Sequence, residues 1–266
     1  MHTITTPTTT RTTPSDSNRG PAAPMTPARR AALIAGIAYI ATFVFSIPVK
    51  FWLWKDAIDT HPDDFILGAG SDDGIRLGAV FEVLTGLGGV VSAVALFAVA
   101  RRYSIRSALG FVTTRVMESM IIFVGVLAML TMYTLRHEPV GGDAAMATMG
   151  RALLAIHDWT FLLGPGVMPA LNALCIATVM YNSRLLPRWI PTLGVIGAPL
   201  LLTSTTATLF GVWDQLSGPA LLLAMPIAVW EFSFGVYMTV KGFRPVPESA
   251  DRSFGCNTDI TPALAA

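Results

Sequence analysis

The sequence predicts an all-α, polytopic membrane protein: six transmembrane helices in a bundle, with the fourth helix kinked at a Gly-Pro-Gly. Composition is the first of three observations behind this prediction. Hydrophobic residues make up 53% of the 266 residues and charged residues 13%, whereas a soluble domain has about 25% charged residues. The second observation is a series of long apolar runs, and the third is an uneven distribution of Lys and Arg between the two sides of the predicted membrane.

Six apolar runs are long enough to span a bilayer. A helix rises about 1.5 Å per residue and therefore needs about 20 mainly apolar residues to cross roughly 30 Å of hydrocarbon. The runs that meet this requirement are residues 31–49, 77–100, 107–135, 152–181, 189–212 and 218–240. Because most of them are joined by short polar connections, a soluble bundle would have almost no polar surface to present to water.

The chain ahead of the first run has the composition of a disordered tail. Residues 1–27 are rich in Thr, Pro, Ser and Ala, so they cannot bury enough surface to offset the entropy of ordering. They are not expected to be a signal peptide, because the apolar run at 31–49 is the first of many. Met25 stands just before this run and is an alternative start of translation.

A long acidic connection separates the first run from the second. Residues 50–76 begin with Lys-Phe-Trp-Leu-Trp and are interpreted as a solvated loop, with a lid over the outer mouth of the bundle as the alternative. In the second run, Gly86, Gly88 and Gly89 favour close packing against a neighbouring helix. The third run, 107–135, follows after a short basic connection.

The fourth run is too long for one straight crossing. Gly164-Pro165-Gly166 interrupts residues 152–181, and a kink or tilt is expected there because proline lacks an N–H and clashes with the preceding turn. A re-entrant pair of half-helices is the alternative, which would change the number of crossings. After the last two runs the chain ends in a second predicted disordered tail, residues 245–266, so that residues 28–244 form the membrane domain.

Lys and Arg are retained on the cytoplasmic side of a membrane, so their distribution predicts the orientation. With six crossings, the side of the two termini carries Arg11, Arg19, Arg29, Arg30, Arg101, Arg102, Arg106, Arg184, Arg188, Lys241, Arg244 and Arg252. The other side carries Lys50, Lys55, Arg76, Arg136 and Arg151, together with nine acidic residues. Both tails are therefore predicted to be cytoplasmic.

Several function classes lack the residues that they require. A net charge of +1 without a basic run argues against a nucleic-acid partner. Cys175 and Cys256 lie in an apolar run and in a tail, so neither a disulfide nor a Cys-based zinc site is expected. The motifs H-E-x-x-H, G-x-S-x-G and G-x-x-x-x-G-K are missing, and the absence of lysine between residues 56 and 240 excludes a retinal Schiff base. No metal and no cofactor is predicted.

Four stretches together carry a family resemblance: FILGAGSDDGIRLGAVFEVL at 65–84, HDWTFLLGPGVMPALNAL at 157–174, SRLLPRWIPTLGVIGAPLL at 183–201 and WEFSFGVYMTVKGF at 230–243. The chain resembles the bacterial membrane family catalogued as domain of unknown function 4386, over roughly residues 28–244. The resemblance implies a multi-pass protein of the bacterial plasma (inner) membrane. It assigns no activity and no catalytic residue.

Ionisable side chains within the runs are the candidate functional residues, because each costs about 2.5–3.5 kcal/mol on insertion scales and so needs a partner or a function. Counted from the outer side, Glu82, His157 and Asp158 lie roughly 9–10 Å deep and could share an outer layer. Counted from the inner side, Arg115, Glu118 and Glu231 lie roughly 14–18 Å deep and could share a middle layer. The candidates for a ligand-binding or polar core are Glu82, Arg115, Glu118, His157, Asp158, Asn172 and Glu231.

The middle layer has two interpretations, a structural ion pair of Arg115 with Glu118 or Glu231, or a ligand site. Four interior carboxylates against Arg115 would leave a charge of −3, so protonation, a cationic His157 or a bound cation has to compensate. His157 is expected to meet Glu82 rather than Asp158, because adjacent helix residues point about 100° apart. Asn172 is expected to supply a hydrogen bond between helices.

Three hypotheses of function follow. The leading one is a non-enzymatic multi-pass membrane protein that binds a small ligand, lipid or cation in a polar intramembrane cavity. The alternative is a small membrane-embedded enzyme acting on a lipid or isoprenoid, with His157, Glu82 and Asp158 in acid and base roles. The third is a structural subunit whose polar residues only fix packing. The expected partners are the bilayer and a small apolar or cationic ligand, and no oligomeric state follows from the sequence.

Overall fold

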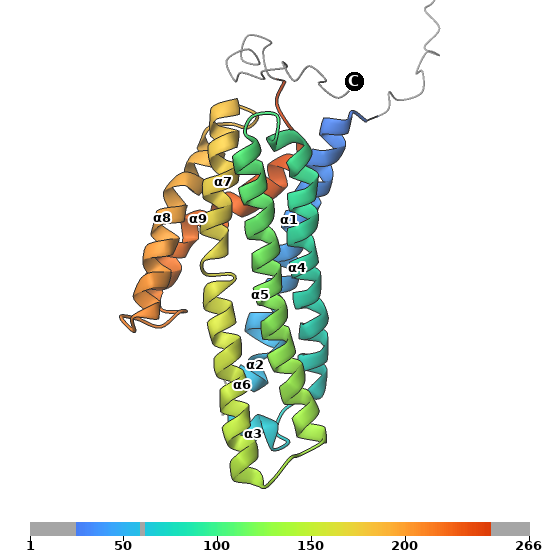
Figure 1. The fold of residues 1–266 in the computed structure, drawn as a ribbon, viewed down its shortest axis with the longest axis vertical. Coiled ribbons are helices and arrows are strands. Elements are labelled where there is room, and N and C mark those ends of the chain that lie inside the picture. Colours follow the sequence, from blue (N-terminus) through green and yellow to red (C-terminus); the bar gives the residue numbers. More distant parts are fainter. Residues whose placement is uncertain (1–24, 59–61, 246–266) are drawn as a thin grey trace, which may run out of the picture.

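A computed structural model describes residues 25–58 and 62–245. Within these ranges every regular element is a helix, and six helical segments are long and apolar enough to cross a membrane. These segments stand together in one bundle (Figure 1). The chain is therefore a multi-pass membrane protein of the all-α class, as the sequence predicts.

The first crossing consists of α1 (Pro27–Pro48) and the turn η1 (Val49–Leu53) that continues it. Thr26 caps α1 by accepting a hydrogen bond from the backbone N–H of Arg29, and Pro27 occupies the first turn, where its missing N–H costs nothing. Pro48 ends the regular part of α1, and η1 is a wider, π-helical turn in which the N–H of Trp54 donates to the carbonyl of Val49 at 3.0 Å.

The second and third crossings, α4 (Asp72–Ala100) and α5 (Ile105–His137), are the longest single helices of the described chain. Each begins at a serine cap, Ser71 for α4 and Ser104 for α5. The 33 residues of α5 extend about 50 Å at 1.5 Å per residue, well beyond roughly 30 Å of hydrocarbon. The helix α4 begins before the apolar run at 77–100, and α5 extends beyond both ends of the run at 107–135.

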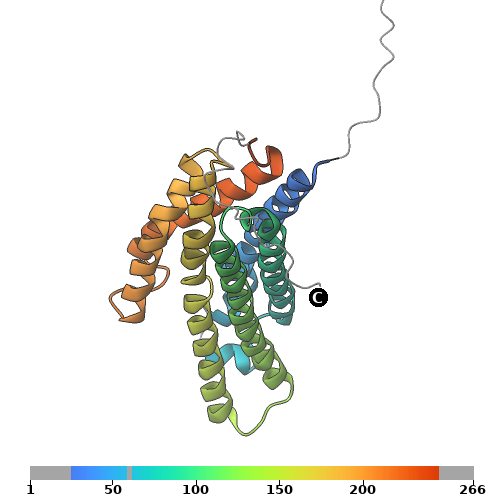
Figure 2. The same ribbon diagram turned by 45° about the horizontal axis from the view of Figure 1, so that its top comes forward.

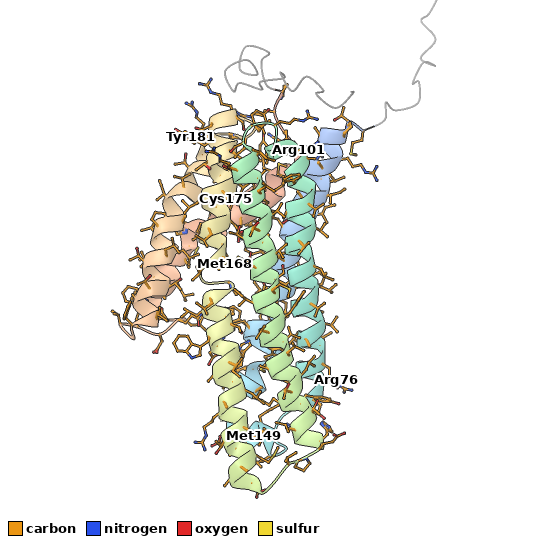
Figure 3. All side chains as sticks on the ribbon, viewed as in Figure 1. Arg76, Arg101, Met149, Met168, Cys175 and Tyr181 are labelled. Carbon is orange, nitrogen blue, oxygen red and sulfur yellow. The ribbon has the colours of Figure 1, made fainter. Side chains whose placement is uncertain are left out.

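The fourth crossing is broken where the sequence predicts a kink. It consists of α6 (Asp143–Leu163) and α7 (Met168–Ser183), which continue in the same direction on either side of the break, with Met168 midway along the bundle (Figures 1 to 3). The turn is too tight for a side chain at Gly166, because an added Cβ would lie 2.2 Å from the carbonyl oxygen of Leu162. The chain thus crosses once here, and the re-entrant alternative is wrong.

The last two crossings, α8 (Trp189–Leu209) and α9 (Gly218–Val240), form a hairpin that leans away from α4, α5 and α6 (Figures 1 and 2). The other end of α9 is held against α1, since a Cβ on Gly36 would lie 2.7 Å from the carbonyl oxygen of Gly235. Beside this contact between α1 and α9, the guanidinium of Arg29 donates to the last carbonyls of α9, at 2.9 Å from Met238 and 2.7 Å from Thr239. The bundle consequently begins and ends on the same side.

The connection at 50–76 differs in part from the predicted solvated loop, because its described residues are mostly helical and several of its apolar side chains are buried, while many of the others are exposed. After η1 it forms α2 (Lys55–Ile58) and α3 (Pro62–Ile66), and α3 lies against α5 and α6 at the end of the bundle opposite the termini, which the sequence predicts to be the outer end. The side chains of Trp54, Phe65 and Ile66 are buried in one apolar cluster with residues of α4, α5 and α6. The segment covers the outer end of these helices.

The predicted disorder of the two tails falls mostly outside the described residues, which begin at 25 and end at 245. The glycines of the second run lie at close approaches, as predicted: a Cβ on Gly86 would lie 2.6 Å from the ring of Phe123, and one on Gly88 3.2 Å from Thr42 of α1.

Candidate functional site

A buried arginine is at the centre of the polar interior. Nη1 of Arg115 lies 3.0 Å from Oε2 of Glu118, one turn further along α5, and Nη2 lies 2.7 Å from Oε1 of Glu231 on α9. The three side chains are 5%, 10% and 14% exposed, respectively. The predicted middle layer therefore exists, and its arginine pairs with both carboxylates at once.

Two further helices contribute to this layer. From α7, Nδ2 of Asn172 donates to Oε2 of Glu118 at 2.7 Å, which is the interhelical hydrogen bond expected from the sequence. From α1, the ring of Tyr39 lies under the guanidinium of Arg115, with 4.6 Å between the guanidinium carbon and the ring centre. Arg115 thus joins α1, α5 and α9 directly and α7 through Glu118.

The outer layer brings Glu82 of α4 and His157 of α6 to one small hollow. This pocket has a volume of about 20 Å³, and Trp54, Glu82, His157 and Thr160 are among its lining residues. His157 is buried, its ring meets that of Trp54 edge-on at 5.1 Å between centres, and its Nδ1 has no hydrogen-bond partner among the described residues. Glu82 and His157 share a pocket as expected, but no hydrogen bond joins them in the described part of the chain.

Asp158 does not belong to this interior layer. Its side chain is 52% exposed, and although its Oδ1 lies 3.4 Å from Nδ1 of His157, the two atoms form no hydrogen bond. The placement follows from helix geometry, since the residue after an inward-facing one points about 100° away from it. The prediction that three residues share the outer interior layer is therefore wrong for Asp158.

A single cavity of about 390 Å³ connects the two layers. Glu82, Arg115, Glu118 and Glu231 all lie on its wall, and Glu82 also lines the small pocket beside His157. The rest of the wall is mostly apolar. Its larger apolar members are Phe43, Ile47, Phe51, Ile122, Phe161, Pro165, Pro169, Leu216 and Leu221. The volume and the few convergent polar groups are typical of small-molecule sites, which occupy about 300–1,000 Å³.

The cavity also holds Lys50, which the sequence places in a loop. Lys50 lies on η1, lines the cavity, and has its Nζ 4.5 Å from the ring centre of Phe161. It also acts electrostatically on Glu82. The sequence offered one signal for an inward position of Lys50, which is that it directly follows the apolar run at 31–49. That the helix continues past Pro48 is not evident from the residues.

The charges on the cavity wall do not balance. Glu82, Glu118 and Glu231 contribute three negative charges when ionised, and Lys50 and Arg115 contribute two positive charges. The resulting −1 replaces the −3 inferred from the sequence, because Asp158 faces outward and Lys50 faces inward. A net charge in a mostly apolar space within the bundle is costly unless a proton or a cation offsets it.

The cavity lies toward the end of the bundle that the sequence predicts to be the outer one, and its wall reaches the surface there. Leu216, in the connection between α8 and α9, shares its wall with Phe161 near the end of α6. Phe51 and Leu221 both line the cavity and are both exposed, so the opening lies between η1 and the start of α9. Asp158 is about one turn beyond Phe161 in the direction of the outer end.

Metal binding finds no support in the described ranges. No group of three or more His, Cys, Asp or Glu side chains there is arranged to hold a metal ion. The cavity wall itself offers carboxylates, two basic side chains and aromatic rings.

The family is established by comparison with known proteins. The family model described as "Domain of unknown function (DUF4386)" matches residues 34–242, which is most of the chain and all six crossings except the first residues of α1. The chain belongs to this family. No curated protein matches it, and no solved structure does.

Proposed function

We propose that this member of the DUF4386 family is a non-enzymatic membrane protein that binds a small monocationic ligand, such as an organic amine, in the cavity between α1, α4, α5 and α9. The observation that carries the proposal is the excess of one carboxylate over the basic side chains of the cavity wall. A monovalent cation would bring the interior to neutrality. A neutral or anionic ligand would leave or increase the imbalance.

The aromatic and apolar wall supports an organic cation rather than a bare metal ion. Phe43, Phe51 and Phe161 offer ring surface, which attracts ammonium groups and buries the carbon atoms that they carry. Metal ions require several converging oxygen or nitrogen ligands, whereas two of the three carboxylates here are already engaged by Arg115.

The location that we propose is the bacterial plasma membrane, with both termini in the cytoplasm. The support is the one-sided distribution of basic residues. At the end where α1 begins, the described chain carries Arg29, Arg30, Arg101, Arg102, Arg106, Arg184, Arg188, Lys241 and Arg244. Figure 3 places Arg101 at this end and Arg76 toward the opposite one.

Native mass spectrometry of the detergent-purified protein tests the proposed function. We expect a stoichiometric small basic molecule to copurify with the wild-type protein and to be lost in Glu118→Gln, while the matched control Glu138→Gln, an exposed carboxylate outside the cavity, retains it. An empty wild-type protein that also fails to take up added amines contradicts the proposal. If Glu118→Gln does not accumulate at all, Glu231→Gln provides the same comparison.

Acid–base catalysis on a lipid or isoprenoid is a second candidate, favoured by the pocket that Glu82 and His157 share. Its volume of about 20 Å³ has room for one water molecule, which the two side chains could activate. This function predicts a pH-dependent turnover that is lost in His157→Ala, whereas a binding protein keeps its ligand stoichiometry in that variant.

A further inference from the structure

Glu82 differs from the other two carboxylates of the cavity. Glu118 is paired with Arg115 and accepts a hydrogen bond from Asn172, and Glu231 is paired with the same Arg115. Glu82 lines the cavity but forms no hydrogen bond or ion pair with residues 25–58 or 62–245. Of the three carboxylates, Glu82 is therefore the one that Arg115 does not engage, and its ionised form has no hydrogen-bond donor among the described residues to stabilise it.

The charged and titratable groups around Glu82 come from each element that lines the same spaces. They are Lys50 of η1, Arg115 and Glu118 of α5, His157 of α6 and Glu231 of α9. Arg115 is already paired with two carboxylates, and Lys50 lies with its Nζ 4.5 Å from the ring centre of Phe161 and acts electrostatically on Glu82. If all of these side chains were ionised and the cavity held no ligand, the cavity would have a net charge that low-dielectric surroundings disfavour.

We propose, on the basis of the proposed function, that the empty cavity holds one proton on Glu82 and that a monocation entering the cavity releases it. The protein thereby exchanges one proton for one cation. The exchange conserves charge, because the neutral carboxylic acid of Glu82 becomes a carboxylate at the moment when the cation supplies the balancing positive charge.

A route for the released proton is built into the wall. When the O–H bond of Glu82 breaks, the proton passes to a water molecule in the pocket of about 20 Å³ and then to an imidazole nitrogen of His157. Nδ1 of His157 lies 3.4 Å from the carboxylate of Asp158, which is half-exposed at the outer part of the bundle. Among the residues that the structure describes, Glu82 is the one carboxylate of the cavity wall that also borders this pocket.

Isothermal titration calorimetry with tetraethylammonium chloride tests the exchange, because this cation is permanently charged and carries no proton of its own. Titrations of the purified full-length protein at pH 7 in phosphate and in HEPES, neither of which is a cationic amine buffer of the proposed ligand class, differ in the heat of buffer protonation, and the difference gives the number of protons released. We expect about one proton per cation bound in the wild-type protein. In addition, apparent affinity should fall as the pH falls, by up to about tenfold per pH unit, because proton and cation compete.

The variant Glu82→Gln identifies the source of the proton. We expect it to release none and to bind tetraethylammonium at least about tenfold more weakly, because its cavity is already neutral, while the control Glu138→Gln behaves as the wild type. Binding by the wild-type protein with the same heat in both buffers and no pH dependence overturns the exchange but leaves the proposed function intact. No binding at millimolar tetraethylammonium in the wild-type protein contradicts the proposed function itself. The pH series needs only the wild type, so a Glu82→Gln protein that fails to fold does not prevent the test.

Discussion

At the scale of single residues, one guanidinium holds the interior of the bundle together. Arg115 satisfies two carboxylates from different helices and lies over an aromatic ring of a third. A buried ion pair need not be more stable than apolar residues in its place, but removing one partner leaves an uncompensated charge. Arg115 therefore determines whether Glu118 and Glu231 are tolerated inside the bundle.

Replacing Arg115 alone should be strongly destabilising. We expect Arg115→Met to lower the free energy of unfolding by about 3–5 kcal/mol, because it leaves two buried carboxylates without a cation. The measurement is the unfolding of the purified protein in increasing denaturing detergent. The triple variant Arg115→Met/Glu118→Gln/Glu231→Gln should recover part of the loss, and a single variant as stable as the wild type would show that the pair does not matter.

The residues of the middle layer could be predicted from the sequence because their chemistry conflicts with their surroundings. A charged residue in an apolar run needs a partner, and Arg115 and Glu118 are three residues apart on one helix. The inward position of Lys50 could not be predicted, since it depends on the wider turn η1 after Pro48. The outward position of Asp158 depends on the rotation of α6 about its axis. The sequence does not determine whether His157 or Asp158 faces the interior.

At the scale of elements, one side chain of α5 makes most of the polar contacts between the described parts of the bundle and the segment after α3, in addition to the apolar packing of that segment. The guanidinium of Arg136 donates to the carbonyls of Phe65, Gly68, Ala69 and Gly70. Its Nε also lies 2.9 Å from a carboxylate oxygen of Asp72 at the start of α4. Four carbonyls on one guanidinium explain how a connection with several acidic residues stays packed.

Loss of this contact should loosen the segment without unfolding the bundle. We expect Arg136→Ala to increase hydrogen–deuterium exchange in residues 62–72, because their carbonyls lose a common donor and Phe65 its cation–π contact. The control is Arg151→Ala, whose exposed side chain makes one ion pair with Asp63 at 3.3 Å. Equal exchange in the two variants would show that the buried apolar side chains alone hold the segment.

The tight turn in the fourth crossing leaves no room for a side chain at Gly166. We expect Gly166→Ala to destabilise the protein by about 1–3 kcal/mol, because its Cβ would meet the carbonyl oxygen of Leu162 at 2.2 Å. The comparison is Gly142→Ala, where an added Cβ meets nothing within 4 Å. Thermal unfolding followed by tryptophan fluorescence measures both, and equal midpoints would contradict the geometry of the break.

All six crossings could be predicted from apolar length, and the break could be predicted from Gly164-Pro165-Gly166. The lengths of α4, α5 and α6 could not, because their outer ends are polar enough to resemble loops. The packing of α2 and α3 was missed for the same reason: two or three buried apolar residues among many acidic ones give no periodic signal.

At the scale of the whole molecule, the helices differ in how far they extend, and α8 and α9 are shorter than α4 and α5. The helices α4, α5 and α6 continue past the connection between α8 and α9 (Figure 1), and α3 packs between their ends. The cavity borders this connection through Leu216 and opens between η1 and α9. A ligand would thus enter from the outer side of the membrane if the termini are cytoplasmic.

This orientation predicts the labelling of single cysteines. In a background in which Cys175 and Cys256 are serine, we expect Glu138→Cys to react with a membrane-impermeant maleimide on intact cells. Arg184→Cys should react only after the cells are opened, because it lies at the opposite end of the bundle. The reverse pattern would place both termini outside and contradict the proposed orientation.

The central claim is that the cavity binds a cation because its carboxylates outnumber its basic side chains. The most direct test is the affinity of the variant Lys50→Gln for tetraethylammonium at pH 8. The variant Lys55→Gln is the control. Lys50 lines the cavity, whereas Lys55 is exposed at α2. Removal of a positive charge from the wall should raise the affinity of the cavity for a cation by about tenfold, and the control should leave it unchanged. An affinity that falls or stays the same in Lys50→Gln, in a protein that remains folded, would show that the charge balance of the cavity does not govern what it binds.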